Sequence, residues 1–241
     1  MNEFFNAIVQ WFSDFGNDLY INFVKYDRWK YLTNGLLTTL QITVLAVLVG
    51  VAIGFLVAII RTTHDQTGKL KIPNAICKLY LTVIRGTPVM VQVLIIYFGI
   101  FASVDIPKLV VAVIAFGLNS GAYVAEIFRS GIMSIDKGQL EAGRSLGFSY
   151  FKTMWLIIMP QALKNVLPAL GNELIVLLKE TSISGYIAMD DLTKGGNIIR
   201  SQTYSAFIPL VAVALIYLAI VLILQAGVNY LERRLRKSDH R

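Results

Sequence analysis

Charged residues are scarce in this chain. Only 15% of its 241 residues are Asp, Glu, Lys or Arg, whereas 56% are hydrophobic, and the mean hydropathy is +0.63. Soluble domains carry roughly 25% charged residues, so the charge here is too sparse to cover a globular surface in water. The composition therefore argues against an ordinary soluble domain and predicts a polytopic membrane protein.

Cysteine, histidine and nucleotide-binding motifs are nearly absent as well. The single cysteine, Cys77, excludes an internal disulfide and a metal site made of cysteines alone. Both histidines, His64 and His240, stand in polar segments, and we expect neither to bind metal. The sequence has no G-x-x-x-x-G-K-[ST] phosphate-binding loop, so we do not expect the chain to bind ATP by that route.

The start of the chain also lacks the basic n-region of a cleaved signal peptide, so we expect it to be retained. Phe, Ile and Trp recur there near helical spacing, which is typical of an amphipathic helix in the membrane interface. We therefore predict an interfacial segment over residues 1–33.

Five apolar stretches are long enough to cross a membrane, which takes about 20 residues in a helix. They are Leu36–Ile60, Ile84–Val104, Leu109–Met133, Val166–Met189 and Ala206–Tyr230, and the fourth is weaker because it holds several charges. Together they predict an all-α transmembrane domain of five spanning helices over residues 34–230.

Basic residues mark the loops on one side of these stretches. They gather after the first stretch, in the loop 134–165 after the third, and in the tail 231–241, while the other two loops are nearly neutral. The positive-inside rule then places the N-terminus outside the cell and the C-terminus inside. The net charge of +7 thus reflects orientation rather than nucleic acid binding, and the tail is weakly attracted to anionic membrane lipid.

The loop 134–165 is polar and contains residues that typically begin or end helices. Asp136, followed three residues later by Gln139, predicts a capping box at the start of a helix Lys137–Leu146. Gly147 suits the left-handed position that commonly follows a helix.

A second helix, Tyr150–Met159, is predicted to begin at a Ser149 cap and to end at Pro160. In the first helix the small side chains of Ala142 and Gly143 let another surface approach closely. Composition alone also suits a helix that floats at the lipid interface.

The spacing of this loop resembles the EAA loop of bacterial ABC-importer membrane subunits. The matching residues are Glu141, Ala142, Gly147, Ile157 and Pro160, with Gly143 in place of the usual third alanine and Met159 in place of the usual leucine. Four further segments, at residues 34–43, 83–92, 118–132 and 167–183, resemble the polar amino acid branch of that family.

This resemblance implies a permease of the type I ABC importer fold in the bacterial cytoplasmic membrane. It implies a pair of permeases (two copies of this chain, or this chain with a sister subunit), an ATPase subunit dimer that binds ATP and Mg²⁺, and a separate extracytoplasmic substrate-binding protein. The chain itself then is no enzyme and needs no cofactor. Its coupling helix fits a groove on the ATPase, and the expected coupling residues are Asp136, Glu141, Ala142, Gly143, Arg144, Gly147 and Pro160.

Polar side chains also occur inside the apolar stretches, where each is costly unless it faces protein or water. Asn119, Tyr123 and Glu126 share one helix face, and Glu173 and Glu180, seven residues apart, share another. Antiparallel spans would place these faces opposite each other. From the family we carry over a translocation path whose candidates are Arg85, Thr87, Gln92, Asn119, Tyr123, Glu126, Asn172, Glu173, Lys179, Glu180, Thr181 and Ser182.

Several of these candidates have a plainer alternative. Glu126 suits an ion pair with Arg129 as well as it suits a ligand role. The hydroxyls of Thr181 and Ser182 often bond to their own helix. Glu180 has no such alternative, because it needs a partner on another helix or a substrate.

Two accounts also fit the segment Arg85-Gly86-Thr87-Pro88. In one, Thr87 caps a helix that starts at Pro88, and the free amide groups of that broken helix attract a substrate carboxylate. In the other, the segment is a plain kink, and Arg85 extends to the cytoplasm.

The favoured function is the path-forming permease subunit of an ATP-driven importer of a polar amino acid. The three path carboxylates favour a cationic or amide side chain such as that of arginine, histidine or glutamine, whereas Lys179 suits an acidic one, and cystine stays open.

Two other classes of function stay open. One is an ion-coupled secondary transporter that uses the buried carboxylates for protons and would usually show internal repeats, which we do not find. The other is a non-transporting membrane scaffold.

Overall fold

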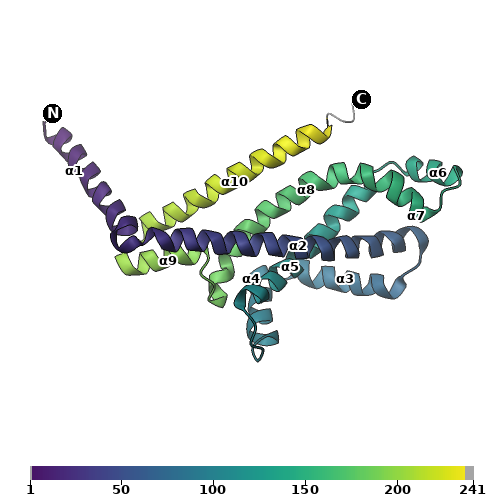
Figure 1. Ribbon diagram of the computed structural model, residues 1–241, viewed down its shortest axis with the longest axis horizontal. Helices are drawn as coiled ribbons and strands as arrows, with labels where there is room; N and C mark the ends of the chain where they lie inside the picture. The colour runs from purple at the N-terminus through teal and green to yellow at the C-terminus, as the bar shows by residue number, and fades with distance from the viewer. Residues whose placement is uncertain (1, 237–241) are drawn as a thin grey trace.

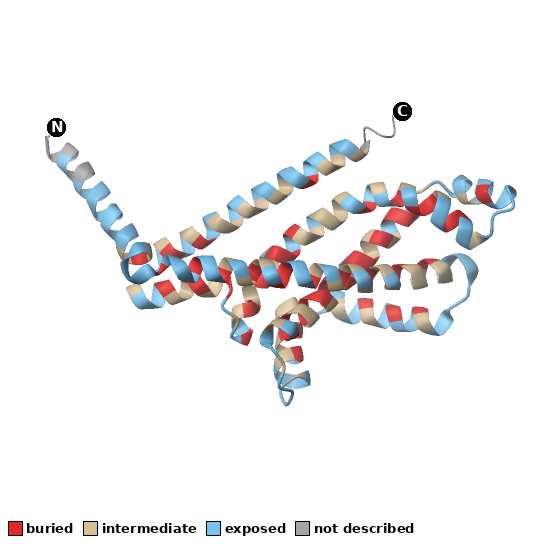
Figure 2. Cartoon of the chain, viewed as in Figure 1, coloured by how far each residue is buried: buried red, intermediate tan, exposed pale blue. Residues whose placement is uncertain are grey.

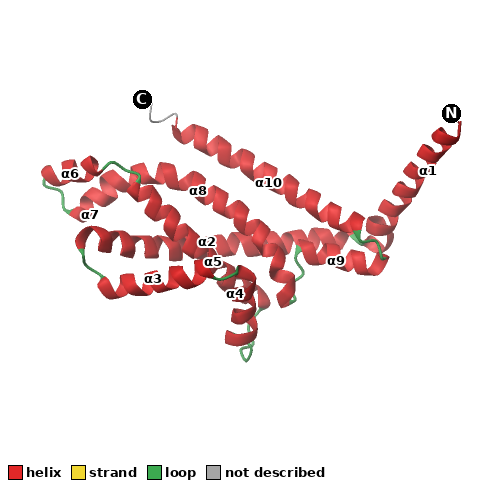
Figure 3. Ribbon diagram, turned by 180° about the vertical axis from the view of Figure 1, so that it is seen from behind, coloured by secondary structure: helices red, strands yellow, loops and turns green. Residues whose placement is uncertain are grey.

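The long axis of the molecule is a single helix. The structure is a computed structural model that describes residues 2–236, and α2 (Trp29–Thr67, 39 residues) runs along its length (Figure 1). Every regular element in the described range is helical, and short connections join the helices (Figure 3). The last residues of the predicted basic tail, 237–241, lie outside the described residues.

The remaining elements follow in a fixed order. They are α1 (Asn2–Leu19), the short turns η1 (Tyr20–Val24) and η2 (Lys25–Asp27), α3 (Lys71–Gly86), α4 (Val89–Ile95), η3 (Ile96–Ile100), α5 (Lys108–Met133), α6 (Lys137–Ser145), α7 (Tyr150–Thr153), η4 (Met154–Ile158), α8 (Met159–Glu180), η5 (Thr181–Ile187), α9 (Leu192–Thr203) and α10 (Phe207–Arg236). Because α2 already begins at Trp29, the predicted segment 1–33 overlaps its first turn.

Three helices of the described chain, α2, α5 and α10, are long and apolar enough to cross a membrane. The pair α3 and α4–η3 would make a fourth span if the bent pair crosses as one unit. The predicted fourth stretch is covered by α8 and η5, which carry several charged side chains. The all-helical membrane architecture is thus confirmed, while the number of five spans and their orientation stay predictions.

The predicted second stretch, Ile84–Val104, is broken near its start. Helix α3 ends at Gly86, α4 begins at Val89, and the two are bent by 110°. The cause is local, because a proline disfavours helical backbone in the residue before it, and Thr87 before Pro88 is extended (φ −123°, ψ 149°).

The prediction that a helix ends at Pro160 is wrong. Helical backbone runs from Tyr150 through the π-helical turn η4 to Glu180, with Pro160 in the first turn of α8. A proline has no N–H to donate and its ring clashes with the carbonyl group one turn earlier. The wider turn just before Pro160 loosens the backbone where that clash would arise.

The core of the fold is the contact between α2 and α5, whose buried residues line the length of both helices (Figure 2). Glycines bring the two backbones together at several levels. A Cβ atom at Gly54 would lie 2.5 Å from a methyl carbon of Val124, and one at Gly117 would lie 2.7 Å from a methyl carbon of Val49. Small residues at such a seam are how helices in membranes pack closely.

Helix α9 was not predicted, because it is short and lies in a loop that is polar in sequence. It packs along the first half of α2 and against α10. Glycines again make the contact, since a Cβ atom at Gly35 would lie 2.5 Å from the carbonyl oxygen of Asp191, and one at Gly195 would lie 2.4 Å from that of Tyr31.

We expect Gly35→Ala to destabilise the protein, because the added carbon would meet backbone rather than a side chain that can move aside. The overpacking should cost about 2 kcal/mol and lower the thermal midpoint of the detergent-purified chain by several degrees. Gly227→Ala in α10 is the matched control, since nothing lies within 4 Å of its added Cβ atom. Equal midpoints for the two variants would contradict the α2–α9 contact.

Candidate functional site

A cluster of charges joins the ends of three helices. The carboxylate of Glu126 on α5 accepts a hydrogen bond from Nη1 of Arg61 on α2 at 2.9 Å and another from Nε of Arg129 at 3.3 Å. Nη1 of Arg85 at the end of α3 lies 3.6 Å away, and its guanidinium also lies 5.8 Å from the ring centre of Tyr123. One carboxylate is therefore shared by three guanidinium groups, and it ties α2, α3 and α5 together.

The predicted pair of Glu126 with Arg129 thus exists as part of a larger cluster. Asp65 on α2 extends it, with a carboxylate oxygen 3.8 Å from Nη1 of Arg129. The role of Arg61 was missed, because it lies 65 residues from its partner in sequence and only the fold brings them together.

A second polar network holds the break between α3 and α4. The buried amide of Gln92 donates to the carbonyl oxygen of Ile84 at 2.7 Å and to both the carbonyl oxygen and the hydroxyl of Thr87, at 2.9 and 2.8 Å. Its own oxygen accepts from Nδ2 of Asn119 on α5 at 2.9 Å. Gln92 and Asn119 therefore stabilise the bend, and both are buried away from the groove described next.

Thr87 does not cap α4. Its hydroxyl donates backwards to the carbonyl oxygen of Val83 at 2.8 Å, and Pro88 stands at the cap position without a side-chain bond. The account in which Thr87 caps a helix is therefore wrong about that cap. The kink expected in the other account is present.

An open groove of about 470 Å³ lies between α5 and α8. Its lining includes Tyr123 and Glu126 from α5 and Asn165 and Glu173 from α8. One oxygen of Glu173 accepts a hydrogen bond from the hydroxyl of Ser120 at 2.9 Å. Two of the predicted path carboxylates thus share one groove, as the antiparallel arrangement of their helices requires.

The remaining candidates lie further along α8 and η5. Asn172 and Lys179 are exposed, and Glu180 is half-buried without a hydrogen-bond partner among residues 2–236. Thr181 is buried and its hydroxyl donates to the carbonyl oxygen of Leu178 at 2.8 Å. The alternative that this hydroxyl bonds to its own helix is therefore confirmed. Ser182 is half-buried on the same turn.

Asp191 is a structural carboxylate that the sequence interpretation missed. It caps α9 by accepting from N–H of Lys194 at 2.6 Å, and it also accepts from N–H of Gly185 at 3.1 Å and from the hydroxyl of Ser184 at 2.8 Å. Burial raises the pKa of this carboxyl group, while these hydrogen bonds act to lower it. An Asp directly before a helical segment is the cap signal that could have revealed it.

Asp136 and Ser149 begin the two helices of the loop after α5, as predicted, but the side chain of Asp136 bonds to Gly138 and not to Gln139, so the described loop does not form the predicted capping box. Asp136 Oδ1 accepts from N–H of Gly138 at 2.6 Å, which starts α6, and Ser149 Oγ accepts from N–H of Lys152 at 3.3 Å, which starts α7. Between them Gly147 has a left-handed φ of 81°. Phe148 N–H bonds to the Gly143 carbonyl and Gly147 N–H to the Arg144 carbonyl, the two bonds of a Schellman ending.

The two small residues of α6 face different ways. Gly143 is buried against its own chain, where a Cβ atom would lie 2.5 Å from a methyl carbon of Thr153. Ala142 is exposed, as are the neighbouring charged residues Glu141 and Arg144. The expectation that small side chains admit another surface therefore fits Ala142, whereas Gly143 serves the elbow between α6 and α7.

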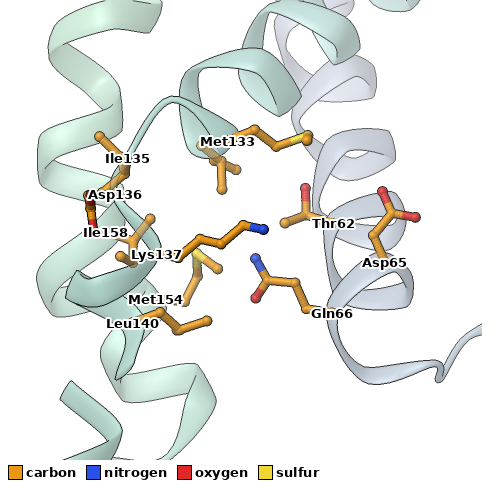
Figure 4. A pocket seen from close by; sticks show the side chains of 11 residues that line it. Thr62, Asp65, Gln66, Met133, Ile135, Asp136, Lys137, Leu140, Met154 and Ile158 are labelled. Carbon is orange, nitrogen blue, oxygen red and sulfur yellow. The ribbon is translucent and has the colours of Figure 1, made fainter. Parts of the chain in front are cut away.

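A hollow of about 260 Å³ separates α6 from the end of α2. The side chain of Lys137 crosses it toward Thr62 and Gln66, and Leu140 and Met154 lie on the side of the loop (Figure 4). Helix α6 thus packs against η4, and the hollow lies between it and the end of α2.

A helical membrane chain with a carboxylate-lined groove and a capped surface helix has the make-up of a transport subunit. The chain belongs to the family described as the binding-protein-dependent transport system inner membrane component, whose model matches residues 50–237.

Named relatives narrow the class. The chain is 36% identical to a putative glutamine transport system permease protein of Rickettsia typhi, over 87% of this chain and 95% of the relative. It is 38% identical to the arginine transport system permease ArtQ of Bacillus subtilis, over 87% and 94% of the two chains. It is 39% identical to the glutamine permease GlnP of Escherichia coli, over 85% and 93%.

Solved structures of amino acid and methionine ABC transporters are also similar to this chain. The structure of an amino acid ABC transporter with histidines matches at a TM-score of 0.79 and 43% identity, over 88% of this chain and 96% of that one. The MetNI methionine ABC transporter in an inward-facing conformation matches at 0.72 and 18% identity, over 87% and 98%, which shows the fold alone. The chain is therefore a multi-pass inner membrane permease of the amino acid ABC importer family, as the EAA loop indicated.

We expect Glu126→Gln to destabilise the junction of α2, α3 and α5, because three guanidinium groups would then lose the carboxylate that they share and only Arg129 would keep an acidic neighbour, Asp65. The loss should be on the order of 2 kcal/mol, since the cluster is only partly exposed. Thermal unfolding of the purified chain measures it, with Asp105→Asn in an exposed loop as the control. A variant as stable as this control would show that the cluster adds no stability.

Proposed function

We propose that the chain forms the translocation path for a polar amino acid and couples it to a separate ATPase subunit. The observation that carries the proposal is a continuous mechanical connection. The capped helix α6 is joined at the Gly147 elbow to α7, and helical backbone then runs without a break through η4 into α8, which bears Glu173 and Glu180. A force on α6 therefore reaches the carboxylate-bearing helix directly.

In this proposal α6 occupies a groove on a dimer of ABC ATPase subunits, which bind ATP and Mg²⁺, while this chain binds no cofactor. The exposed Glu141, Ala142 and Arg144 provide the contact, and Asp136 and Gly147 fix the two ends of the helix. A hollow, which the Lys137 side chain crosses, lies between α6 and the end of α2. Closure of the ATPase pair would move α6 with α8 relative to the α2–α5 core, and so alternate the side on which the path opens.

A second permease, either another copy or a sister subunit, completes the path. One chain leaves the groove between α5 and α8 open, and Asn172 and Lys179 are exposed. An extracytoplasmic substrate-binding protein delivers the amino acid. We place the N-terminus outside and the C-terminus inside, because the α6 loop must then lie in the cytoplasm with the ATPase.

The proposed substrate is a zwitterion with a cationic or amide side chain. Glu126 is already held by three arginines, so Glu173 and the unpaired Glu180 are the carboxylates open to a substrate. The relatives named for glutamine and arginine transport support this class.

We expect Glu141→Lys to reduce ATP-driven uptake in the reconstituted complex roughly tenfold, equivalent to about 1.4 kcal/mol, because it reverses charge on the exposed face of α6. Expression and assembly in the membrane should be unchanged. Lys152→Glu on α7 is the matched control, since it reverses an exposed charge in the same loop outside the proposed contact. Equal uptake by the two variants would remove the coupling role from α6.

We further expect Glu180→Gln to change the substrate range or the transport rate, because the Glu180 carboxylate makes no hydrogen bond or ion pair within the described chain. Competition of unlabelled arginine, histidine, glutamine and glutamate against labelled substrate measures the range. Uptake that keeps both its rate and its order of competitors would make this carboxylate structural.

A further inference from the structure

Helix α1 presents an uncovered aromatic face. Phe4, Trp11, Phe12 and Phe15 lie on one side of the helix at about 100° per residue, and all four are exposed, Phe12 at 63%. The ring of Trp11 stacks on that of Phe15, with centroids 5.5 Å apart. The described part of α1 is exposed along its length, and it projects from the body of the molecule (Figures 1 and 2). A single amphipathic helix of this kind needs a surface to cover its apolar face.

The turn between α1 and α2 is not a loose linker. Tyr26 and Asp27 both have left-handed backbone, with φ of 60° and 56°, which folds the chain back on itself. Arg28 is buried, donating through Nη1 to the carbonyl oxygen of Ile21 and through Nε to Gln202 Oε1 at 3.2 Å.

A buried amide fixes the other side of this turn. Asn22 donates to the carbonyl oxygen of Asp18 at 2.8 Å, at the end of α1, and accepts from the hydroxyl of Thr203 at 2.9 Å. Thr203 and Gln202 are the last residues of α9. Arg28 and Asn22 therefore clamp the start of α2 and the end of α1 to α9, and they set the direction in which α1 leaves.

The first turn of α2 marks the depth of this clamp in the membrane. Exposed aromatic side chains surround it, and cations lie against two of them: Lys25 Nζ is 5.3 Å from the Tyr26 ring centre, and Lys30 Nζ is 5.8 Å from that of Trp29. Aromatic rings with adjacent Lys or Arg at the end of a spanning helix are typical of the membrane–water interface. The end of α1, which the turns η1 and η2 join to α2, is thus expected at the level of the lipid headgroups.

We propose that α1 lies on the membrane surface with its aromatic face inserted among the lipids, and that the Arg28–Asn22 clamp to α9 holds it there at a fixed angle to α2. The lipid surface is the occupant that these features favour, because the aromatic face is continuous with the interfacial belt of a helix that crosses the same membrane. The binding should be insensitive to salt, since the chain has no Lys or Arg before Lys25, whereas basic interfacial helices depend on anionic headgroups.

Two neighbouring positions test the face. In a Cys77→Ser background, Phe12→Cys and Ser13→Cys carry a nitroxide label in the full chain in liposomes, and power saturation compares access of oxygen with that of a water-soluble nickel chelate. Residues 12 and 13 lie about 100° apart around the helix, on its aromatic and polar sides. The label at 12 should favour oxygen and the label at 13 nickel, both unchanged at about 1 M salt, where the Debye length is about 3 Å.

Two outcomes would overturn the proposal. Nickel access at both positions would show that water covers the aromatic face. Low access of both reagents at position 12 would show that protein, such as a second copy, covers it.

A second measurement tests the clamp, and its result does not depend on whether α1 inserts into the membrane. Labels at Ser13 and Ser201 should give a narrow distance distribution that Arg28→Gln broadens, while Lys25→Gln, an exposed neighbour, leaves it narrow. A distance distribution of the same width with and without Arg28→Gln would show that the clamp does not set the angle.

Discussion

The close contact between α2 and α5 is the constraint on which the rest of the structure depends. Glycines at 50 and 54 on α2 and at 117 and 121 on α5 leave no room for a side chain, so the two longest buried helices approach backbone to backbone. In a membrane, where lipid is as apolar as the protein core, such packing supplies much of the driving force between helices. The contact also sets the register, because each glycine fits one position on its neighbour.

That register decides where the polar groups meet. With α2 and α5 fixed, Arg61 reaches Glu126, and the next faces of α5 meet other helices, with Asn119 on Gln92 of α4 and Ser120 on Glu173 of α8. The polar side chains inside the membrane therefore divide into two kinds. Those that bond to another helix hold the bends and crossings, and the half-buried Glu180 is left for a partner outside this chain. Helix α8 is joined to α5, and to the residue that follows it, by hydrogen bonds from Ser120 to Glu173 and from Asn165 to Ser134, and it is also the helix to which α6 is linked through η4.

The apolar stretches of α2, α5 and α10, the cap residues Asp136 and Ser149 and the left-handed Gly147 were predictable, because apolar length, cap residues and helix breaks are local properties of the sequence. The unbroken helix through Pro160 was not, because a proline usually marks the end of a helix, whereas here it lies in the first turn of α8 directly after a π-helical turn. Helix α9 was hidden since its burial relies on glycines opposite distant carbonyl groups. The pairing of Gln92 with Asn119, and of Arg61 with Glu126, needed the tertiary fold, so the sequence interpretation could propose a polar face but not say which members bond within the chain.

The central claim is that this permease moves a polar amino acid only when an ATPase acts on it. Uptake of labelled amino acid into proteoliposomes, with and without the copurified ATPase subunit and internal ATP, tests this most directly. The account predicts uptake only when the ATPase and ATP are both present, and no response to an imposed proton or sodium gradient. Uptake driven by an ion gradient alone, without the ATPase, would contradict it and identify a secondary transporter instead.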